Sequence, residues 1–597
     1  MGSYSLRHVF FFLVLATGHS EISHSEVMLK MDEALLTVQS QMSYGLYVVY
    51  TSDYCYKCLY QPLASMEGGP GHVSVVVSTP FTLTLKVSAL NGSSVLCGLS
   101  YLFEEAGHYS LWVKPGEADL ACNVTCFISV DKFPNSTYLP LLALALVLGL
   151  LTFLWASVPF LSRCSCTSKL INLICCHGSQ YTIEREEEII EDCMDRDERK
   201  SSRLKSLDTF RGFSLTVMVF VNYGGGGYWF FQHVPWNGLS VADLVMPWFV
   251  FIIGTSVMLA FNAMQRKGVP RLQLLRKMTW RTVVLMLIGF CFINYSPRDG
   301  LLSWSWLRIP GVLQRLAFTY FVLSLMQTIS PYQDIPPKQI HWWSPVQDVL
   351  LYWPEWLFIL LLEVMWLCVT FLLPVPNCPT GYLGAGGIGD NGLYPNCTGG
   401  AAAYVDRWLL GDNIYWYPTC KAMYHTTQPF DPEGILGTIN SVVMGFIGMQ
   451  AGKIFLFFRK RNYSIMIRFM VWAIILGILA AILSKCTRDE GFIPVNKNLW
   501  SLSYVACMGC TSFVLLGVMY FAVDIKEWWG GQPFIYLGMN SILVYVGHSL
   551  LGFYFPFSWE MRYQDSHWEK LIQSLWGTVL WLFIAYLLYR KRFFLKI

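Results

Sequence analysis

Long apolar segments alternate with short polar ones from about residue 138 to the end of the chain. Eleven of these segments reach or approach the roughly 20 residues with which a helix crosses about 30 Å of hydrocarbon. They lie near residues 138–161, 212–231, 241–263, 282–295, 311–329, 355–375, 435–453, 465–484, 500–522, 534–555 and 571–589. The fourth is short by this rule, so we expect its helix to extend back to Arg281. The pattern predicts a polytopic α-helical membrane protein with about 11 transmembrane helices.

The pattern before residue 138 is that of strands. Stretches such as HVSVVVSTPFTLTLKVSAL are β-branched, partly alternating and interrupted by turn residues, which predicts a small β-sandwich over residues 21–137. This region holds five cysteines and three glycosylation sequons, as in proteins of an oxidising lumen. They are Cys55, Cys58, Cys97, Cys122 and Cys126, and Asn91, Asn123 and Asn135. Cys55 and Cys58 could form a redox or zinc motif, but no thioredoxin-like helix follows, which favours a structural disulfide.

The first 20 residues carry a basic start, a short apolar run from Val9 to Ala16 and small residues after it. This is typical of a cleavable signal peptide, because the run is too short for an uncleaved anchor. A lumenal N-terminus places the sequon at Asn396 in the lumen and the C-terminus in the cytosol. Three basic clusters then face the cytosol, as positive-inside bias requires. They are Arg266, Lys267, Arg271, Arg276 and Lys277; Lys453, Arg459, Lys460 and Arg461; and Arg590, Lys591 and Arg592.

A cytosolic linker, residues 162–207, separates the first helix (138–161) from a ten-helix core over residues 208–597. Four cysteines beside the membrane in this linker are either palmitoylated or plain reduced thiols. The acidic run EREEEIIEDCMDRDERK indicates a solvated linker, with an endosomal sorting signal as the alternative. Nine cysteines fall in lumenal segments, and the odd number leaves one free or paired between chains.

Composition agrees with a membrane location, since hydrophobic residues make up 54% of the chain and charged residues 14%. The net charge of +3 is too small to indicate a nucleic-acid partner. The chain has no Walker loop, no G-x-S-x-G, no Rossmann fingerprint and no metal-ligand spacing of His and Cys. We therefore expect neither a nucleotide fold nor a metal site.

The strongest candidate chemistry lies between residues 202 and 255. Asn222 falls within an apolar segment, four glycines follow at 224–227, and His233 comes next between aromatic residues. Polar groups in a membrane are costly and often functional, and imidazole can act as a base or nucleophile near neutral pH. The glycines favour a turn or a close approach to a ligand over a phosphate cradle, with plain helix packing as the alternative. His548 is the rival histidine, although a bond to a helix carbonyl would explain it without catalysis.

Further polar residues gather at the ends of the apolar segments, where most such residues are simply interfacial. Convergence of several of them on one site would define a polar pocket. They are Arg211, Asp243, Arg308, Arg315, Asp431, Glu433, Asn496, Lys497, Asn498 and Asn540.

Six ordered strings resemble the transmembrane acyltransferase family, and the resemblance covers the whole chain. They are RLKSLDTFRG, the region from Asn222 to Gly224, LRIPGVLQRLA, FDPEGILGTI, PVNKNLWSLSYV and GMNSILVYVGH. The resemblance implies acetyl transfer from cytosolic acetyl-CoA to the terminal non-reducing α-glucosamine amine of heparan sulfate in the lysosomal lumen. It also implies a multi-pass lysosomal membrane protein, surrounded by lipid and assembled as a homodimer. The family's active-site histidine and asparagine fall on His233 and Asn222.

This activity suggests roles for the other polar residues. We expect Arg211, Lys267, Arg276, Lys277, Arg281 and Arg315 to hold the CoA phosphates. Asn222 could donate to the thioester carbonyl, and Asp243, Asp431, Glu433, Lys497 and Asn498 could bind the sugar. His233 either deprotonates the amine in a ternary complex, which we favour, or accepts the acetyl group itself. A transporter of a sugar or organic anion is the alternative class, although no internal repeat is evident; a receptor is a third.

Overall fold

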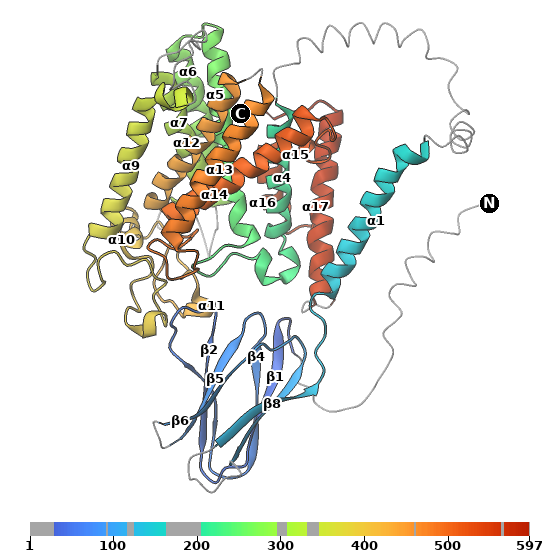
Figure 1. Cartoon of the computed structure of the whole chain (residues 1–597), viewed down its shortest axis with the longest axis vertical. Helices are drawn as coiled ribbons and strands as arrows, with labels where there is room; N and C mark the ends of the chain where they lie inside the picture. The colour runs from blue at the N-terminus through green and yellow to red at the C-terminus, as the bar shows by residue number, and fades with distance from the viewer. Residues whose placement is uncertain are drawn as a thin grey trace, which may run out of the picture.

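The computed structural model describes residues 29–90, 94–115, 124–162, 204–294, 307–330, 346–458, 461–562 and 566–595. A β-domain lies at one end of the molecule and a bundle of helices stands above it, with α1 at the edge of the bundle (Figure 1). The predicted signal peptide, the sequons at Asn91 and Asn123, Cys122 and most of the predicted linker lie outside the described residues.

The β-domain consists of two four-stranded sheets with a shared apolar core. Their orders are β4-β1-β7-β8 and β3-β2-β5-β6. The strands are β1 Glu33–Ser40, β2 Leu46–Ser52, β3 Gln61–Met66, β4 Gly71–Ser78, β5 Leu83–Ala89, β6 Val95–Tyr101, β7 His108–Pro115 and β8 Val124–Lys132. In β1 every second residue is buried, since alternate side chains of a strand point to opposite faces. The β-rich N-terminal region expected from the sequence is confirmed.

Three disulfides are present among the described residues. Cys97 in β6 is bonded to Cys126 in β8, which links the two sheets. Cys378 is bonded to Cys397, and Cys55 to Cys58. The structural disulfide expected for the Cys55-x-x-Cys58 pair is therefore present. Two further cysteines expected in the lumen, Cys420 and Cys486, carry free thiols.

Helices make up most of the rest of the chain. Their bounds are α1 Leu139–Ser162, α4 Lys205–Asn222, η1 Gly225–Gly227, η2 Trp229–Phe231, α5 Val241–Arg266, α6 Arg271–Ile288, η3 Gly289–Ile293, α7 Val312–Ile329, α8 Gln347–Leu350, α9 Trp353–Leu372, η6 Asp390–Gly392, α10 Gly400–Leu410, α11 Lys421–Tyr424, α12 Ile435–Phe457, α13 Asn462–Ser484, α14 Leu502–Met519, η7 Tyr520–Ile525, α15 Phe534–Met539, α16 Ser541–Leu551 and α17 His567–Arg590. In the described part of the chain, seven helices are long and apolar enough to cross a membrane: α5, α7, α9, α12, α13, α14 with η7, and α17. The chain is thus a polytopic helical membrane protein.

The centre of the bundle is the crossing of α5 and α12, where the two backbones meet at glycines. A Cβ added to Gly254 would collide with the carbonyl oxygen of Gly445, and one added to Gly448 would collide with that of Phe251. Thr255 Oγ1 donates to the Gly448 carbonyl oxygen across the same crossing, at 2.9 Å. Small residues allow this approach, which gains van der Waals contact between membrane helices.

Three helix boundaries differ from those expected. The helix expected over 212–231 is α4, which ends at Asn222 because Gly224 to Gly227 all adopt positive φ, where only glycine is free of strain. The fourth helix begins at Arg271 rather than Arg281. The helix expected over 534–555 is two short ones, α15 and α16. They part at Asn540, whose side chain bonds the backbone of Phe593 and Leu595.

Candidate active site

Two cavities meet inside the molecule. The inner cavity, about 470 Å³, lies between α4, α5, α6, α7 and α16; the outer cavity, about 790 Å³, lies between the bundle and the β-domain. Three residues line both of them: His233, Glu433 and Lys497. These three side chains therefore stand at the junction of the two cavities.

The inner cavity follows α5 over nearly its whole length. Its lining runs from Ala242, near the start of that helix, to Met264, near its end. At 1.5 Å per residue this is about 33 Å, which matches the hydrocarbon thickness of a bilayer. Asn222, the last residue of α4, and His233 line this cavity, as do Arg211, eleven residues earlier in α4, and Arg281 in α6. The cavity is long enough to connect one face of a membrane to the other.

The glycine turn after α4 brings His233 to the junction. The chain leaves α4 at Asn222, turns through the four left-handed glycines and the short helix η2, and reaches His233 before α5 begins. His233 Nδ1 lies 2.7 Å from Asp243 Oδ1, and the imidazole remains 53% exposed. The histidine is thus held on one side and open on the other.

Asp243 has a fully buried side chain, at the third position of α5. It forms a capping box with Ser240, and its Oδ2 also accepts from the backbone N–H of Val234. Such a box satisfies the free N–H groups at a helix start. Asp243, which the sequence predicts to bind the sugar, lines neither cavity, and its carboxylate contacts His233.

The contacts of His233 indicate which ring nitrogen carries the proton. Lys497 Nζ lies 3.3 Å from Nδ1 and 4.0 Å from Asp243 Oδ1. The shorter contact is with the carboxylate, which can only accept, so Nδ1 carries a proton and donates it to Asp243. In the neutral ring Nε2 then holds the lone pair. This geometry leaves the His233 Nε2 lone pair without a bond to the protein among the described residues, at the junction of the two cavities.

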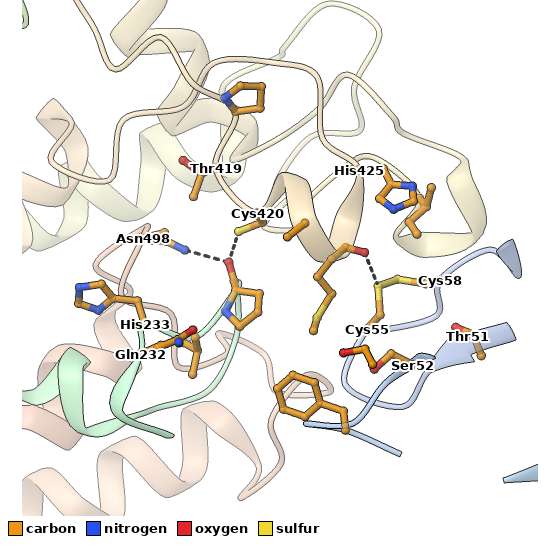
Figure 2. Close-up of a pocket in the computed structure, with 18 of the residues that line it drawn as sticks. Thr51, Ser52, Cys55, Cys58, Gln232, His233, Thr419, Cys420, His425 and Asn498 are labelled. Carbon is orange, nitrogen blue, oxygen red and sulfur yellow. Dashed lines mark hydrogen bonds between the residues drawn. A yellow bond between two sulfur atoms is a disulfide. The ribbon is translucent and has the colours of Figure 1, made fainter. Parts of the chain in front are cut away.

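The loop that carries His233 is held by a second pair of contacts. The carbonyl oxygen of Pro235 accepts from Asn498 Nδ2 at 3.4 Å and from the thiol of Cys420 (Figure 2). Burial raises the pKa of the Cys420 thiol to about 12, so it stays protonated and able to donate. Asn498, expected to bind the sugar, lines the outer cavity while its amide nitrogen serves this loop.

Arg308 joins the two acidic residues that precede α12. It donates from Nε to Asp431 at 2.9 Å and from Nη2 to both Asp431 and Glu433. Burial by itself raises the pKa of Glu433, but Arg308, with Arg315 and Lys497, holds it below the ordinary value. Asp431 is fully buried in this pair and lines neither cavity, whereas Glu433 lines both. Only Glu433 of the two is placed to meet a ligand.

The six basic residues expected to hold CoA phosphates separate into two groups. Arg211 and Arg281 line the inner cavity. Arg211 donates to Ser256 at 2.8 Å, while the guanidinium of Arg281 lies 4.7 Å from the Tyr320 ring centre, and its Nε is buried without a hydrogen-bond partner among the described residues.

The other four stand apart from the cavity. Lys267, Arg276 and Lys277 are exposed on the surface. Arg315 is buried, stacks on Trp500 and donates to the carbonyl oxygens of Pro432 and Gly434. Its position indicates that it shapes the loop of Glu433.

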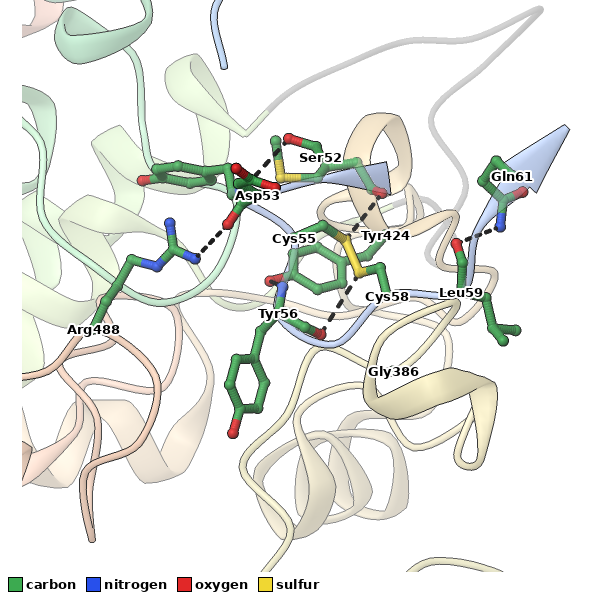
Figure 3. The surroundings of a disulfide bond; sticks show 12 residues. Ser52, Asp53, Cys55, Tyr56, Cys58, Leu59, Gln61, Gly386, Tyr424 and Arg488 are labelled. Atoms are coloured by element: carbon green, nitrogen blue, oxygen red, sulfur yellow. Dashed lines mark hydrogen bonds between the residues drawn. A yellow bond between two sulfur atoms is a disulfide. The ribbon is translucent and has the colours of Figure 1, made fainter. Parts of the chain in front are cut away.

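The sequence did not indicate that the β-domain forms part of the site. Residues of its second sheet and loops line the outer cavity together with His233. They include Thr51 (Figure 2), Leu59 and Phe81. The loop of the Cys55–Cys58 disulfide docks on the bundle, where the backbone N–H of Tyr56 donates to the Tyr424 hydroxyl at 3.3 Å (Figure 3). Arg488 Nη2 donates to the Asp53 carbonyl oxygen at 3.4 Å beside it. No local pattern reveals such docking.

The fold and the site define a polytopic membrane protein with a long internal cavity and a histidine bonded to a buried carboxylate. Comparison with known proteins is specific: residues 203–332 match the family model "Heparan-alpha-glucosaminide N-acetyltransferase, catalytic". The chain is 46% identical over 596 residues to the heparan-alpha-glucosaminide N-acetyltransferase of Mus musculus, covering 96% of this chain and 90% of that one. It is 45% identical over 601 residues to the Homo sapiens protein of that name, covering 96% and 89%.

The chain therefore belongs to the heparan-alpha-glucosaminide N-acetyltransferase family and is an N-acetyltransferase. The matched family segment contains both Asn222 and His233, together with Asp243 and Arg281. The transporter alternative is not favoured, since the relatives carry the name of an enzyme.

Proposed function

We propose that this enzyme transfers the acetyl group of cytosolic acetyl-CoA to the terminal non-reducing α-glucosamine amine of heparan sulfate in the lysosomal lumen. The observation that carries the proposal is the junction at His233. One cavity approaches it along the length of a membrane helix, and a second approaches it from the β-domain. Acetyl-CoA is too polar to cross a bilayer. A donor and an acceptor on opposite sides of the membrane must therefore meet inside a cavity of the protein.

The proposed arrangement in the membrane has eleven transmembrane helices, with the β-domain in the lumen and the C-terminus in the cytosol. The broken pair α15 and α16 counts as one crossing, and α1, α4 and α6 join the seven apolar helices. Asn135 and Asn396 lie at the lumenal end in this arrangement, where glycosylation occurs. A homodimer surrounded by lipid completes the proposal.

In the reaction, the acceptor enters through the outer cavity as an ammonium, releases one proton to the water in that cavity, and attacks the thioester carbonyl carbon as the neutral amine. His233 Nε2 takes the proton that the amine loses as the new C–N bond forms. Asn222 donates to the carbonyl oxygen while negative charge develops there. The C–S bond then breaks, and the proton returns from His233 to the departing CoA sulfur. The products are the N-acetylated sugar and free CoA, and Asp243 stabilises the imidazolium in between.

The acceptor ammonium must bind before it loses its proton. Glu433 is the carboxylate at the junction of the cavities, and its lowered pKa keeps it charged well below neutral pH. Phe81 from the β-domain offers an apolar face to the sugar chain in the outer cavity. The acceptor therefore lies between the bundle and the β-domain.

The direct test is acetyl transfer from radiolabelled acetyl-CoA by the purified full-length protein in detergent. We expect label on the amine of glucosamine and of heparan oligosaccharides that end in α-glucosamine, and none on oligosaccharides already N-acetylated there. A folded protein that binds acetyl-CoA but labels none of these acceptors would refute the proposed function.

The CoA end of the inner cavity gives a second prediction. Arg281→Ala should raise the KM for acetyl-CoA by about 10- to 100-fold, since a charge-assisted hydrogen bond contributes about 1.5–3 kcal/mol. Its kcat should change little, because the phosphates lie far from the reacting carbon. Initial rates over a range of acetyl-CoA concentrations measure both values.

Lys205→Ala is the matched control, because Lys205 begins α4 as an exposed cation and lines neither cavity. Its KM should equal that of the wild type. An unchanged KM in Arg281→Ala would show that the CoA phosphates do not bind at this part of the cavity.

A further inference from the structure

A second histidine lies behind Asn222, in a different helix. His548 in α16 places Nε2 2.9 Å from Asn222 Nδ2, although 326 residues separate the two along the chain. His548 is 3% exposed and lines neither cavity, whereas Asn222 lines the inner one. The imidazole can therefore reach a substrate only through Asn222.

The contacts of His548 determine which of its nitrogens carries the proton. Nδ1 lies 3.1 Å from the carbonyl oxygen of Val544, one turn earlier in α16, and a carbonyl can only accept. Nδ1 must therefore be the donor. The ring lies against Tyr223 and Tyr545, and no acidic side chain of the described residues bonds to it, so a charged imidazolium would be costly there. In the neutral ring, Nε2 is left as an acceptor.

This tautomer in turn orients the amide of Asn222. An acceptor at Nε2 requires the Nδ2 group of Asn222 beside it, because a flipped amide would place Oδ1 against the imidazole lone pair. The first N–H of Nδ2 is used in this bond. The second N–H remains for a ligand in the inner cavity, which is the donor that the proposed mechanism requires.

We propose that His548 is a positioning residue, which holds the Asn222 amide so that its free N–H binds the thioester carbonyl oxygen in the transition state. This inference rests on the proposed function. It assigns the two histidines different tasks: His233 moves the proton, and His548 orients the oxyanion donor. The Val544 carbonyl fixes the proton on His548 Nδ1, and His548 Nε2 in turn orients the Asn222 amide.

Two substitutions of His548 separate its two hydrogen bonds. His548→Asn keeps a donor near the position of Nδ1, for the Val544 carbonyl, but removes the acceptor for Asn222. His548→Gln places an amide oxygen near the position of Nε2, where it can accept from Asn222. We expect kcat to fall by roughly 10- to 100-fold in His548→Asn, towards the loss expected of a missing oxyanion donor. The KM for acetyl-CoA should not change, and His548→Gln should recover most of kcat.

A double-mutant cycle with Asn222→Ala is the decisive measurement. If His548 acts through Asn222, the double variant Asn222→Ala/His548→Asn is no slower than Asn222→Ala alone, because nothing remains to be oriented. Two independent losses that multiply would overturn the inference, as would full kcat in His548→Asn. Should His548→Asn not fold, the same cycle with His548→Ala applies, since alanine also lacks the acceptor for Asn222, and multiplying losses again refute the inference. Wild-type transfer in the same assay separates these outcomes from failure of the proposed function.

Discussion

His233→Ala is expected to abolish acetyl transfer while the protein folds, inserts and binds acetyl-CoA as the wild type does. The imidazole is half exposed at the junction of the two cavities, so its removal leaves the packing of the bundle intact. Of the carboxylates nearby, Asp243 is buried and Glu433 is paired with Arg308, so neither is expected to replace Nε2 as the base. Transfer from radiolabelled acetyl-CoA, measured beside size-exclusion profile and thermal stability, gives the result.

The matched control is His72→Ala. His72 is an exposed histidine in β4, and it lines neither cavity. Activity of this variant should equal that of the wild type, which shows that loss of a histidine as such is harmless. Near-normal transfer by a well-folded His233→Ala protein would refute the proposed mechanism, and Lys497 or Glu433 would become the candidate for the base.

Asn222→Ala should lower kcat by about 100-fold or more, the usual cost of losing one donor to an oxyanion. The ground-state carbonyl carries little charge, so the KM for acetyl-CoA should change much less. Steady-state kinetics with both substrates varied measures the two values separately.

Asn222→Asp distinguishes the donor from the shape of the side chain. It preserves the size of the residue but replaces the amide N–H groups with a second acceptor. The aspartate variant should therefore be at least as slow as the alanine variant. A kcat within about threefold of wild type in either one would exclude an oxyanion role for Asn222.

Much of the architecture can be predicted from the sequence because hydropathy is a local property. Apolar length predicted the seven described helices that are long and apolar enough to cross a membrane, and alternation in the first part of the chain predicted the β-rich region. The predicted helix boundaries were wrong where a few residues determine the path of the backbone. Four glycines end α4 nine residues early, and the side chain of Asn540 separates α15 from α16 by binding the far C-terminal segment.

The sequence carried a signal for the helix contact of Asp243. Ser240 and Asp243 have the spacing of a capping box directly before an apolar run, which predicts that the carboxylate is engaged at a helix start. A carboxylate so engaged is poorly placed to bind a substrate ammonium. The same geometry explains why it can instead orient a histidine ten residues earlier in the chain.

Local patterns and ordered motifs were enough to assign the membrane class, the β-rich first region and the family. They also singled out His233 and Asn222 as the two main candidates for catalytic residues. Only the tertiary structure decided which polar side chains work together. Arg281 lines the inner cavity, whereas Arg315 is buried and bonds to a loop. Glu433 lines both cavities, whereas Asp431 is buried in its ion pair with Arg308. The pairing of Asn222 with His548 spans 326 residues and arises where α4 and α16 pack side by side. Such convergence depends on the packing of helices in three dimensions, which no periodicity along the chain encodes.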